Sequence, residues 1–233
     1  KFIFKTGAKT ILKRRYVDDI TNQKVFGLYS IDDQSFEKKD EIKFQSLLKT
    51  EIPKYDMVLV SDYGHGLISK SSAKTIVKKS KFLAINAQLN AANVGHHTIA
   101  RYKNAELVII NENEMRHELR NKVDSKEHLI KELSKKLNSK LTVVTSGDEG
   151  SLIYEKKNKK TIKCPAFANK VKDKVGTGDA MLVALALSIY KKNNLYFSML
   201  FASLAAAQNI EFTANSKSIN KLSLIKSLQS YLK

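Results

Sequence analysis

The 233 residues, 42% hydrophobic with 9 glycines and 2 prolines, can build a sizeable buried core, which excludes a disordered chain. There is no apolar run long enough for a membrane span and no secretory signal, and the single cysteine, Cys164, excludes a disulfide framework and favours a cytoplasmic location. The net charge is +18, but only five basic residues are arginines and the lysines are spread along the chain, so we expect phosphorylated small molecules as partners and no nucleic acid.

The first elements in the chain are extended. Residues 10–17 and 24–29 have strand-like composition, and the polar residues 18–22 between them predict a β-hairpin over 10–31. A helix is expected at about 35–50. Since the chain starts without Met directly before this hairpin, we expect it to be part of a longer polypeptide.

Strands and helices then alternate. Short apolar runs predict strands, and helical segments separate or follow them. The expected strands are 57–62, 82–86, 107–111, 141–146 and 151–154, and the expected helices are 69–79, 112–120, 125–138, 179–191, 195–210 and 217–232. This order predicts a single α/β domain over 1–233, with a mostly parallel sheet covered on both faces.

The turn Gly176-Thr177-Gly178-Asp179 leads directly into an apolar helix. Free amides in the first turn of a helix bind anions, and glycines let the backbone approach a ligand closely. Asp179 would then face a phosphoryl group as a general base. Ordinary helix capping explains the same residues equally well.

Three more polar motifs follow predicted strands, where open α/β sheets bind ligands. Asp62 with Gly64 and Gly66 is either a ligand contact or a simple turn. Asn111 and Glu114 have the spacing of a capping box and also of an amide and carboxylate that share a hydrated Mg²⁺. Residues 145–150 either line a ligand site or turn into the next strand.

Other site classes lack support. With one cysteine and no His-Glu-x-x-His motif, a zinc site is not expected, and a hydrolase elbow, a Walker P-loop and a dinucleotide fingerprint are missing from the sequence.

Together, the four motifs resemble the ribokinase-like (PfkB) carbohydrate kinases, in the expected order from about residue 8 to 215. Residues 171–180 are similar to the C-terminal signature of that family, and Asn111-Glu112-Asn113-Glu114 is similar to its Asn-x-x-Glu motif. Ser61-Asp62-Tyr63-Gly64-His65-Gly66 and the hairpin resemble the heptose-7-phosphate kinases. The resemblance implies a three-layer α/β/α fold with the 10–31 hairpin as a lid, and ATP-dependent phosphorylation of a sugar hydroxyl.

The resemblance also implies roles for residues. Asp179 would be the base, and the amides of Gly176, Thr177 and Gly178 would form an anion hole. Asn111 and Glu114 would hold Mg²⁺ through water, Asp62 and Asp179 would contact the sugar, and a monovalent cation is a further expected cofactor. The expected nucleotide-binding residues are Asn111, Thr145, Ser146, Gly147, Gly150, Asn209 and Asn215.

The chain departs from the family pattern in three places. Roughly the first 100 residues of a family domain, with a Gly-Gly sugar motif, have no counterpart here. His65 replaces a lysine, and Asn86 stands where many members have aspartate. A non-catalytic nucleotide-binding remnant, or a domain of a longer bifunctional sugar kinase and nucleotidyltransferase, is therefore the alternative. The lid hairpin is also expected to pair two subunits into a homodimer.

Overall fold

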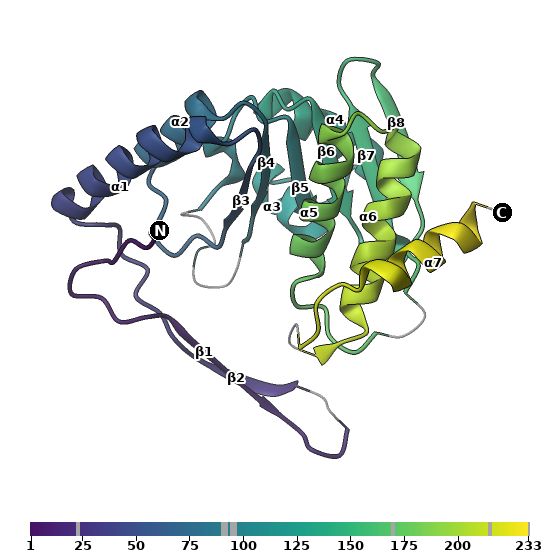
Figure 1. The fold of residues 1–233 in the computed structure, drawn as a ribbon, viewed down its shortest axis with the longest axis horizontal. Coiled ribbons are helices and arrows are strands. Elements are labelled where there is room, and N and C mark those ends of the chain that lie inside the picture. The colour runs from purple at the N-terminus through teal and green to yellow at the C-terminus, as the bar shows by residue number, and fades with distance from the viewer. Residues whose placement is uncertain (22–23, 90–92, 94–96, 169–170, 214–215, 233) are drawn as a thin grey trace.

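A six-stranded sheet lies between two layers of helices in the computed structural model of the chain (Figure 1). The structure describes residues 1–21, 24–89, 93, 97–168, 171–213 and 216–232. The expected three-layer α/β architecture is therefore confirmed.

The sheet has the order β3-β4-β5-β6-β7-β8. Neighbouring strands from β3 to β6 pair in parallel, whereas β7 runs antiparallel to both of its neighbours, β6 and β8. Helices connect β3 to β4 and β5 to β6, while short turns suffice for the antiparallel strands. The strands are β3 (Val58–Asp62), β4 (Leu83–Ala87), β5 (Leu107–Asn111), β6 (Leu141–Thr145), β7 (Ser151–Glu155) and β8 (Lys160–Cys164).

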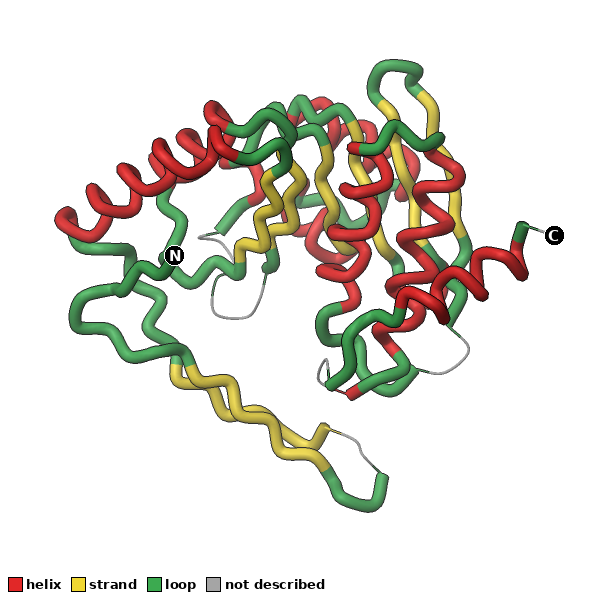
Figure 2. Tube along the Cα trace, in the orientation of Figure 1, coloured by secondary structure: helices red, strands yellow, loops and turns green. Residues whose placement is uncertain are grey.

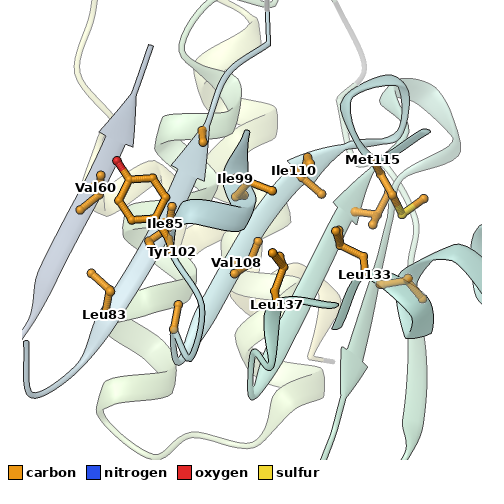
Figure 3. Close-up of a cluster of buried hydrophobic side chains, with 14 of the residues drawn as sticks. Val60, Leu83, Ile85, Ile99, Tyr102, Val108, Ile110, Met115, Leu133 and Leu137 are labelled. Carbon is orange, nitrogen blue, oxygen red and sulfur yellow. The ribbon is translucent and has the colours of Figure 1, made fainter. Parts of the chain in front are cut away.

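Two apolar cores form because alternate strand residues point to opposite faces of the sheet. Val108 and Ile110 of β5 join the core under the first helices, part of which is drawn in Figure 3, while Leu107 and Ile109 join the core under the last helices. The first layer contains α1 (Lys38–Glu51), α2 (Lys70–Lys79), α3 (Glu112–Leu119) and α4 (Lys126–Leu137). The second contains α5 (Thr177–Tyr190), α6 (Leu195–Ile210) and α7 (Lys221–Tyr231).

The predicted hairpin is present as β1 (Leu12–Val17) and β2 (Lys24–Ser30), and it extends away from the sheet (Figure 2). All its strand residues are exposed. The rings of Tyr16 and Phe26 stack with centroids 4.3 Å apart, on the same face as Leu12 and Leu28. A lone two-stranded ribbon with an apolar face is marginally stable in water.

Every expected helix and strand is found, and one strand was missed. β8 is an edge strand in which only Ile162 and Cys164 are buried, and its lysines hide the apolar pattern. Within the part of the chain that the structure describes, no helix is long and apolar enough to cross a membrane.

Candidate active site

Helix α5 begins at the predicted turn. Its N-cap, Gly176, has a left-handed backbone (φ 81°) that favours glycine and has no side chain with which to cap the helix. The first-turn amides therefore lie at an electropositive helix end without a side-chain cap, where the Thr177 amide makes only a long hydrogen bond of 3.5 Å to the Lys174 carbonyl. Such an end suits an anion.

Asp179 lies in the first turn of α5, and two hydroxyl groups from the end of β3 donate hydrogen bonds to its carboxylate. The Ser61 hydroxyl lies 2.7 Å from Oδ1, and the Tyr63 hydroxyl lies 3.0 Å from Oδ2. The carboxylate is thus held at the carboxyl edge of the sheet, where α/β proteins bind ligands.

Asp62, between these two residues, points to the other face of the sheet. It is 5% exposed; its Oδ1 accepts the Gly64 amide at 2.9 Å, and its Oδ2 accepts the Tyr102 hydroxyl at 2.6 Å. Because side chains alternate along a strand, Ser61 faces Asp179 while Asp62 lies beneath the sheet. The structure does not bring Asp62 and Asp179 together, and a sugar contact by Asp62 stays a prediction.

A cavity of about 620 Å³ opens beside Asp179. The hairpin contributes Lys13 and Arg15, which share one face of β1, and the loop before α5 contributes Lys174. Sequence reasoning missed these cations, as well as Ser61 and Tyr63. The remaining lining residues are Ile11, Tyr63, His65, Gln88, Val175, Gly176, Gly178 and Asp179.

A second cavity, of about 820 Å³, lies at the other end of the sheet, between the start of β6 and the α5–α6 connection. It is lined by Lys140, Lys156 and Lys160, among others, and by none of the residues predicted for the site. The carboxylate of Asp179 and the N-terminus of α5 both lie at the smaller cavity, which is therefore the candidate site.

Asn111 and Glu114 form the capping box of α3. The Glu114 amide donates to Asn111 Oδ1 at 2.8 Å, and Glu114 Oε2 accepts the Asn111 amide at 3.0 Å. Glu114 Oε1 also accepts the Leu89 amide, and burial raises the pKa of this carboxyl group. Capping therefore explains the spacing, and the Mg²⁺ role stays a prediction.

A role for this pair in holding Mg²⁺ through water stays a prediction. Among the described residues, no cluster of three or more His, Cys, Asp or Glu could hold a metal ion. Mg²⁺ commonly keeps several waters and binds one or two carboxylates and the substrate phosphates. Asn111 and Glu114 have oxygen atoms of that type, and each of these three oxygens already accepts one backbone hydrogen bond, so water would have to use their remaining lone pairs.

Residues 145–150 follow β6 as predicted. Thr145 pairs with Asn111 of β5, so the two motifs are adjacent, and the Ser146 hydroxyl donates to Glu112 at 2.8 Å. Gly147 has φ 60° and faces open space, whereas the backbone of Cys164 and Pro165 crowds Gly150. Gly147 therefore has open space beside it, its nucleotide contact stays a prediction, and Gly150 serves the turn into β7.

Asn209 of α6 lies behind the turn at the start of α5. The Thr177 hydroxyl is 3.4 Å from its Oδ1, and Asn209 is 9% exposed. This places Asn209 against the predicted anion hole. Asn215 lies outside the described residues.

The two departures from the family pattern, Asn86 and His65, also lie at this edge. Asn86 of β4 pairs with Ser61 and packs against Gly178, and its buried Oδ1 has no hydrogen-bond partner among the described residues. His65 lines the cavity, and burial together with Lys13 lowers its pKa, so it is neutral at pH 7.

The chain is similar in sequence to known proteins. The chain is 26% identical over 208 residues to the bifunctional protein HldE of Nitratiruptor sp., covering 88% of this chain and 42% of that protein. It is 30% identical over 168 residues to the bifunctional protein HldE of Campylobacter fetus, covering 71% of this chain and 34% of that protein. The chain thus spans less than half the length of these relatives.

Solved structures show the same fold. Phosphofructokinase-2 from Escherichia coli in complex with potassium has a TM-score of 0.74 at 13% identity, covering 94% of this chain and 70% of its own. Ribokinase from Thermotoga maritima has a TM-score of 0.70 at 17% identity, covering 95% of this chain and 70% of its own. The fold is therefore ribokinase-like, as the sequence predicted. The family model of the pfkB carbohydrate kinases matches residues 2–221, and this chain belongs to that family.

Proposed function

We propose that this chain carries out ATP-dependent phosphoryl transfer to a sugar hydroxyl. The observation that supports it most is the position of Asp179, which lies in the first turn of α5, beside Gly176 and at the edge of a basic cavity. A base next to an anion site is what phosphoryl transfer to an alcohol needs.

In the proposed reaction, an oxygen of Asp179 takes the proton of the acceptor hydroxyl. The hydroxyl oxygen forms a bond to the γ-phosphorus, the bond from phosphorus to the β,γ-bridging oxygen breaks, and ADP leaves. The amides of Gly176, Thr177 and Gly178 stabilise the charge on the transferring group, because they are oriented before the reaction. When bound, Mg²⁺ would neutralise phosphate charge near Asn111 and Glu114.

The acceptor that we propose is a heptose phosphate or a related phosphorylated sugar. The motif 61–66 resembles heptose-7-phosphate kinases, and three cations line the cavity (Lys13, Arg15 and Lys174). Phosphate groups bind such clusters through charge-assisted hydrogen bonds. A sugar without a phosphate would place no negative charge beside these three cations.

The nucleotide is proposed to lie towards β5 and β6, against Thr145, Ser146 and Gly147. A monovalent cation is a further proposed cofactor, since the similar phosphofructokinase-2 was solved with potassium. Because the chain covers 42% of one HldE relative, we propose that it is one pfkB-type domain of a larger kinase and nucleotidyltransferase system. Cys164 is its single cysteine, in keeping with the reducing cytoplasm that we propose as its location.

The test is a coupled assay of ADP release with ATP, Mg²⁺ and a panel of sugars and sugar phosphates, alongside calorimetric titration with ATP–Mg²⁺. ADP release that depends on a phosphorylated sugar supports the proposal. ATP binding without transfer to any acceptor would favour a non-catalytic nucleotide-binding domain.

A further inference from the structure

Tyr63 has a position that the proposed chemistry does not by itself explain. Its hydroxyl lies 3.0 Å from Asp179 Oδ2, and the Ser61 hydroxyl lies 2.7 Å from Oδ1 of the same carboxylate. Both oxygens of the proposed base are therefore engaged by the end of β3.

The backbone on both sides of Tyr63 is anchored. On one side, Asp62 is buried and accepts hydrogen bonds from the Tyr102 hydroxyl and from the Gly64 amide two residues on. On the other, the Asn93 side-chain amide donates to the Tyr63 carbonyl at 3.1 Å. Gly64 has φ 69°, which other residues adopt only with strain. The turn therefore holds Tyr63 in one direction.

The phenol of Tyr63 is suited to donate. Partial burial, and then the nearby Asp179 carboxylate, raise the pKa of Tyr63, so its hydroxyl keeps its proton at neutral pH. Lys13 of the lid places its Nζ 5.3 Å from the centroid of the Tyr63 ring. Tyr63 thus contacts the lid through its ring and Asp179 through its hydroxyl.

We propose that Tyr63 is a positioning residue for Asp179. An ionised carboxylate has about four lone-pair sites, of which Ser61 and Tyr63 occupy two. With those two sites engaged, the carboxylate is held in one orientation, and the remaining lone pairs face the cavity where the acceptor hydroxyl binds. Small errors in such alignment reduce turnover strongly, because the proton must pass between correctly placed atoms. This inference rests on the proposed function.

A double-mutant cycle tests the role. Tyr63→Phe removes the hydroxyl but keeps the ring beside Lys13, and we expect it to lower kcat about 10-fold with an unchanged KM for ATP, the scale of a hydrogen bond to a charged group. In an Asp179→Asn background, the same change is expected to have no further effect, because there is no longer a base to position. A merely structural role would lower activity equally in both backgrounds.

Two controls accompany the cycle. Tyr55→Phe removes the hydroxyl of a tyrosine that is 57% exposed and does not line the cavity, and it should leave kcat unchanged. Ser61→Thr keeps a hydroxyl at the second donor position and should retain more activity than Ser61→Ala. Thermal unfolding of each variant identifies any loss of fold.

A second measurement needs no activity. In a chain with tyrosines labelled at Cζ, the resonance missing from Tyr63→Phe identifies Tyr63 among nine tyrosines. Its titration midpoint should fall in Asp179→Asn, since the negative charge that opposes phenolate formation is gone. A Tyr63 titration midpoint that is the same in the wild type and in Asp179→Asn would overturn the contact between Tyr63 and Asp179.

The outcomes separate the inference from the proposed function. An active enzyme in which Tyr63→Phe has the same effect with and without Asp179 overturns the inference alone. A wild-type chain that transfers no phosphoryl group overturns the proposed function, and with it the catalytic role of Tyr63, whatever the titration shows. If Tyr63→Phe lowers kcat only in the chain that retains Asp179, and the titration midpoint of Tyr63 falls in Asp179→Asn, both the inference and the proposed function are supported.

Discussion

The Ser61 hydroxyl lies 2.7 Å from Asp179 Oδ1, although 118 positions of the chain separate the two residues. This hydrogen bond joins the carboxyl end of β3 to the first turn of α5, where side chains from the sheet and amides from the helix meet. A change at either end of this contact is therefore expected to alter the geometry of the other.

Replacing Asp179 with asparagine should lower kcat at least ~100-fold, the scale for losing a positioned base. Steady-state kinetics with a phosphorylated sugar measures this, and ATP binding by calorimetry should persist. Asp56→Asn is the matched control, since its side chain is 70% exposed and pairs with Lys81. Turnover near the wild-type value in Asp179→Asn would remove this residue from the mechanism.

Gly176→Ala should reduce both stability and turnover. Gly176 has φ 81°, and a side chain in this region costs about 1–2 kcal/mol of unfolding free energy. Gly7 has φ 74° and open space around it, so Gly7→Ala carries similar strain far from the chemistry. Urea unfolding should show comparable losses for the two variants, whereas only Gly176→Ala should lower kcat. Equal kcat values would contradict the anion-hole role.

Lys13→Gln should raise the KM for a phosphorylated acceptor about 10-fold, the scale of one charge-assisted hydrogen bond. Arg14 is the control, because side chains alternate along β1 and Arg14 shares the face of Tyr16, turned away from Lys13 and Arg15. Added salt should raise the wild-type KM more than that of Lys13→Gln, since screening weakens the same attraction. A larger effect from Arg14→Gln would assign the acceptor to the other face of the lid.

The apolar face of the hairpin is expected to pair two copies of the chain. Phe26 is 53% exposed and stacks on Tyr16, and burial of this face would stabilise a ribbon that otherwise faces water. Sedimentation velocity should show a dimer for the wild type and a monomer for Phe26→Lys. Ile20→Lys, at the exposed turn of the hairpin, should remain dimeric. A monomeric wild type at micromolar concentration would rule this pairing out.

Acid should destabilise the fold partly through His97. Burial lowers the pKa of His97, against the opposing effect of Asp62, so the folded state holds this imidazole neutral. The unfolded chain then binds more protons, and the unfolding free energy should fall as pH decreases from about 6.5, the usual histidine value, towards the lower folded pKa.

Urea unfolding between pH 7.5 and 5 measures this effect. His97→Gln should flatten the dependence, and His128→Gln, on an exposed side chain, should not. The other charged groups near His97 are Arg101 and Glu118. A slope that is the same in wild type and His97→Gln would assign the acid sensitivity to other groups.

The sequence predicted the helices and nearly all the strands because apolar runs and their periods are local. It also predicted which edge of the sheet carries the polar motifs, since each motif follows the strand that delivers it. β8 was missed because three of its five residues are lysine or threonine, which leaves only Ile162 and Cys164 as an apolar signal. Ser61 and Tyr63 were missed as well, although their spacing of two around Asp62 was a usable signal for a shared face.

The order of elements and the glycine turn before Asp179 are thus properties of the sequence itself. The tertiary structure decided which groups surround Asp179: the face of β3 that carries Ser61 and Tyr63, and the lid face that carries Lys13 and Arg15. Such contacts depend on how α5 crosses the sheet and on the alternation at the end of one strand. A local sequence pattern contains neither the crossing of α5 nor the register of β3. A shift of one residue in the strand register would send the same side chain to the opposite face of the sheet.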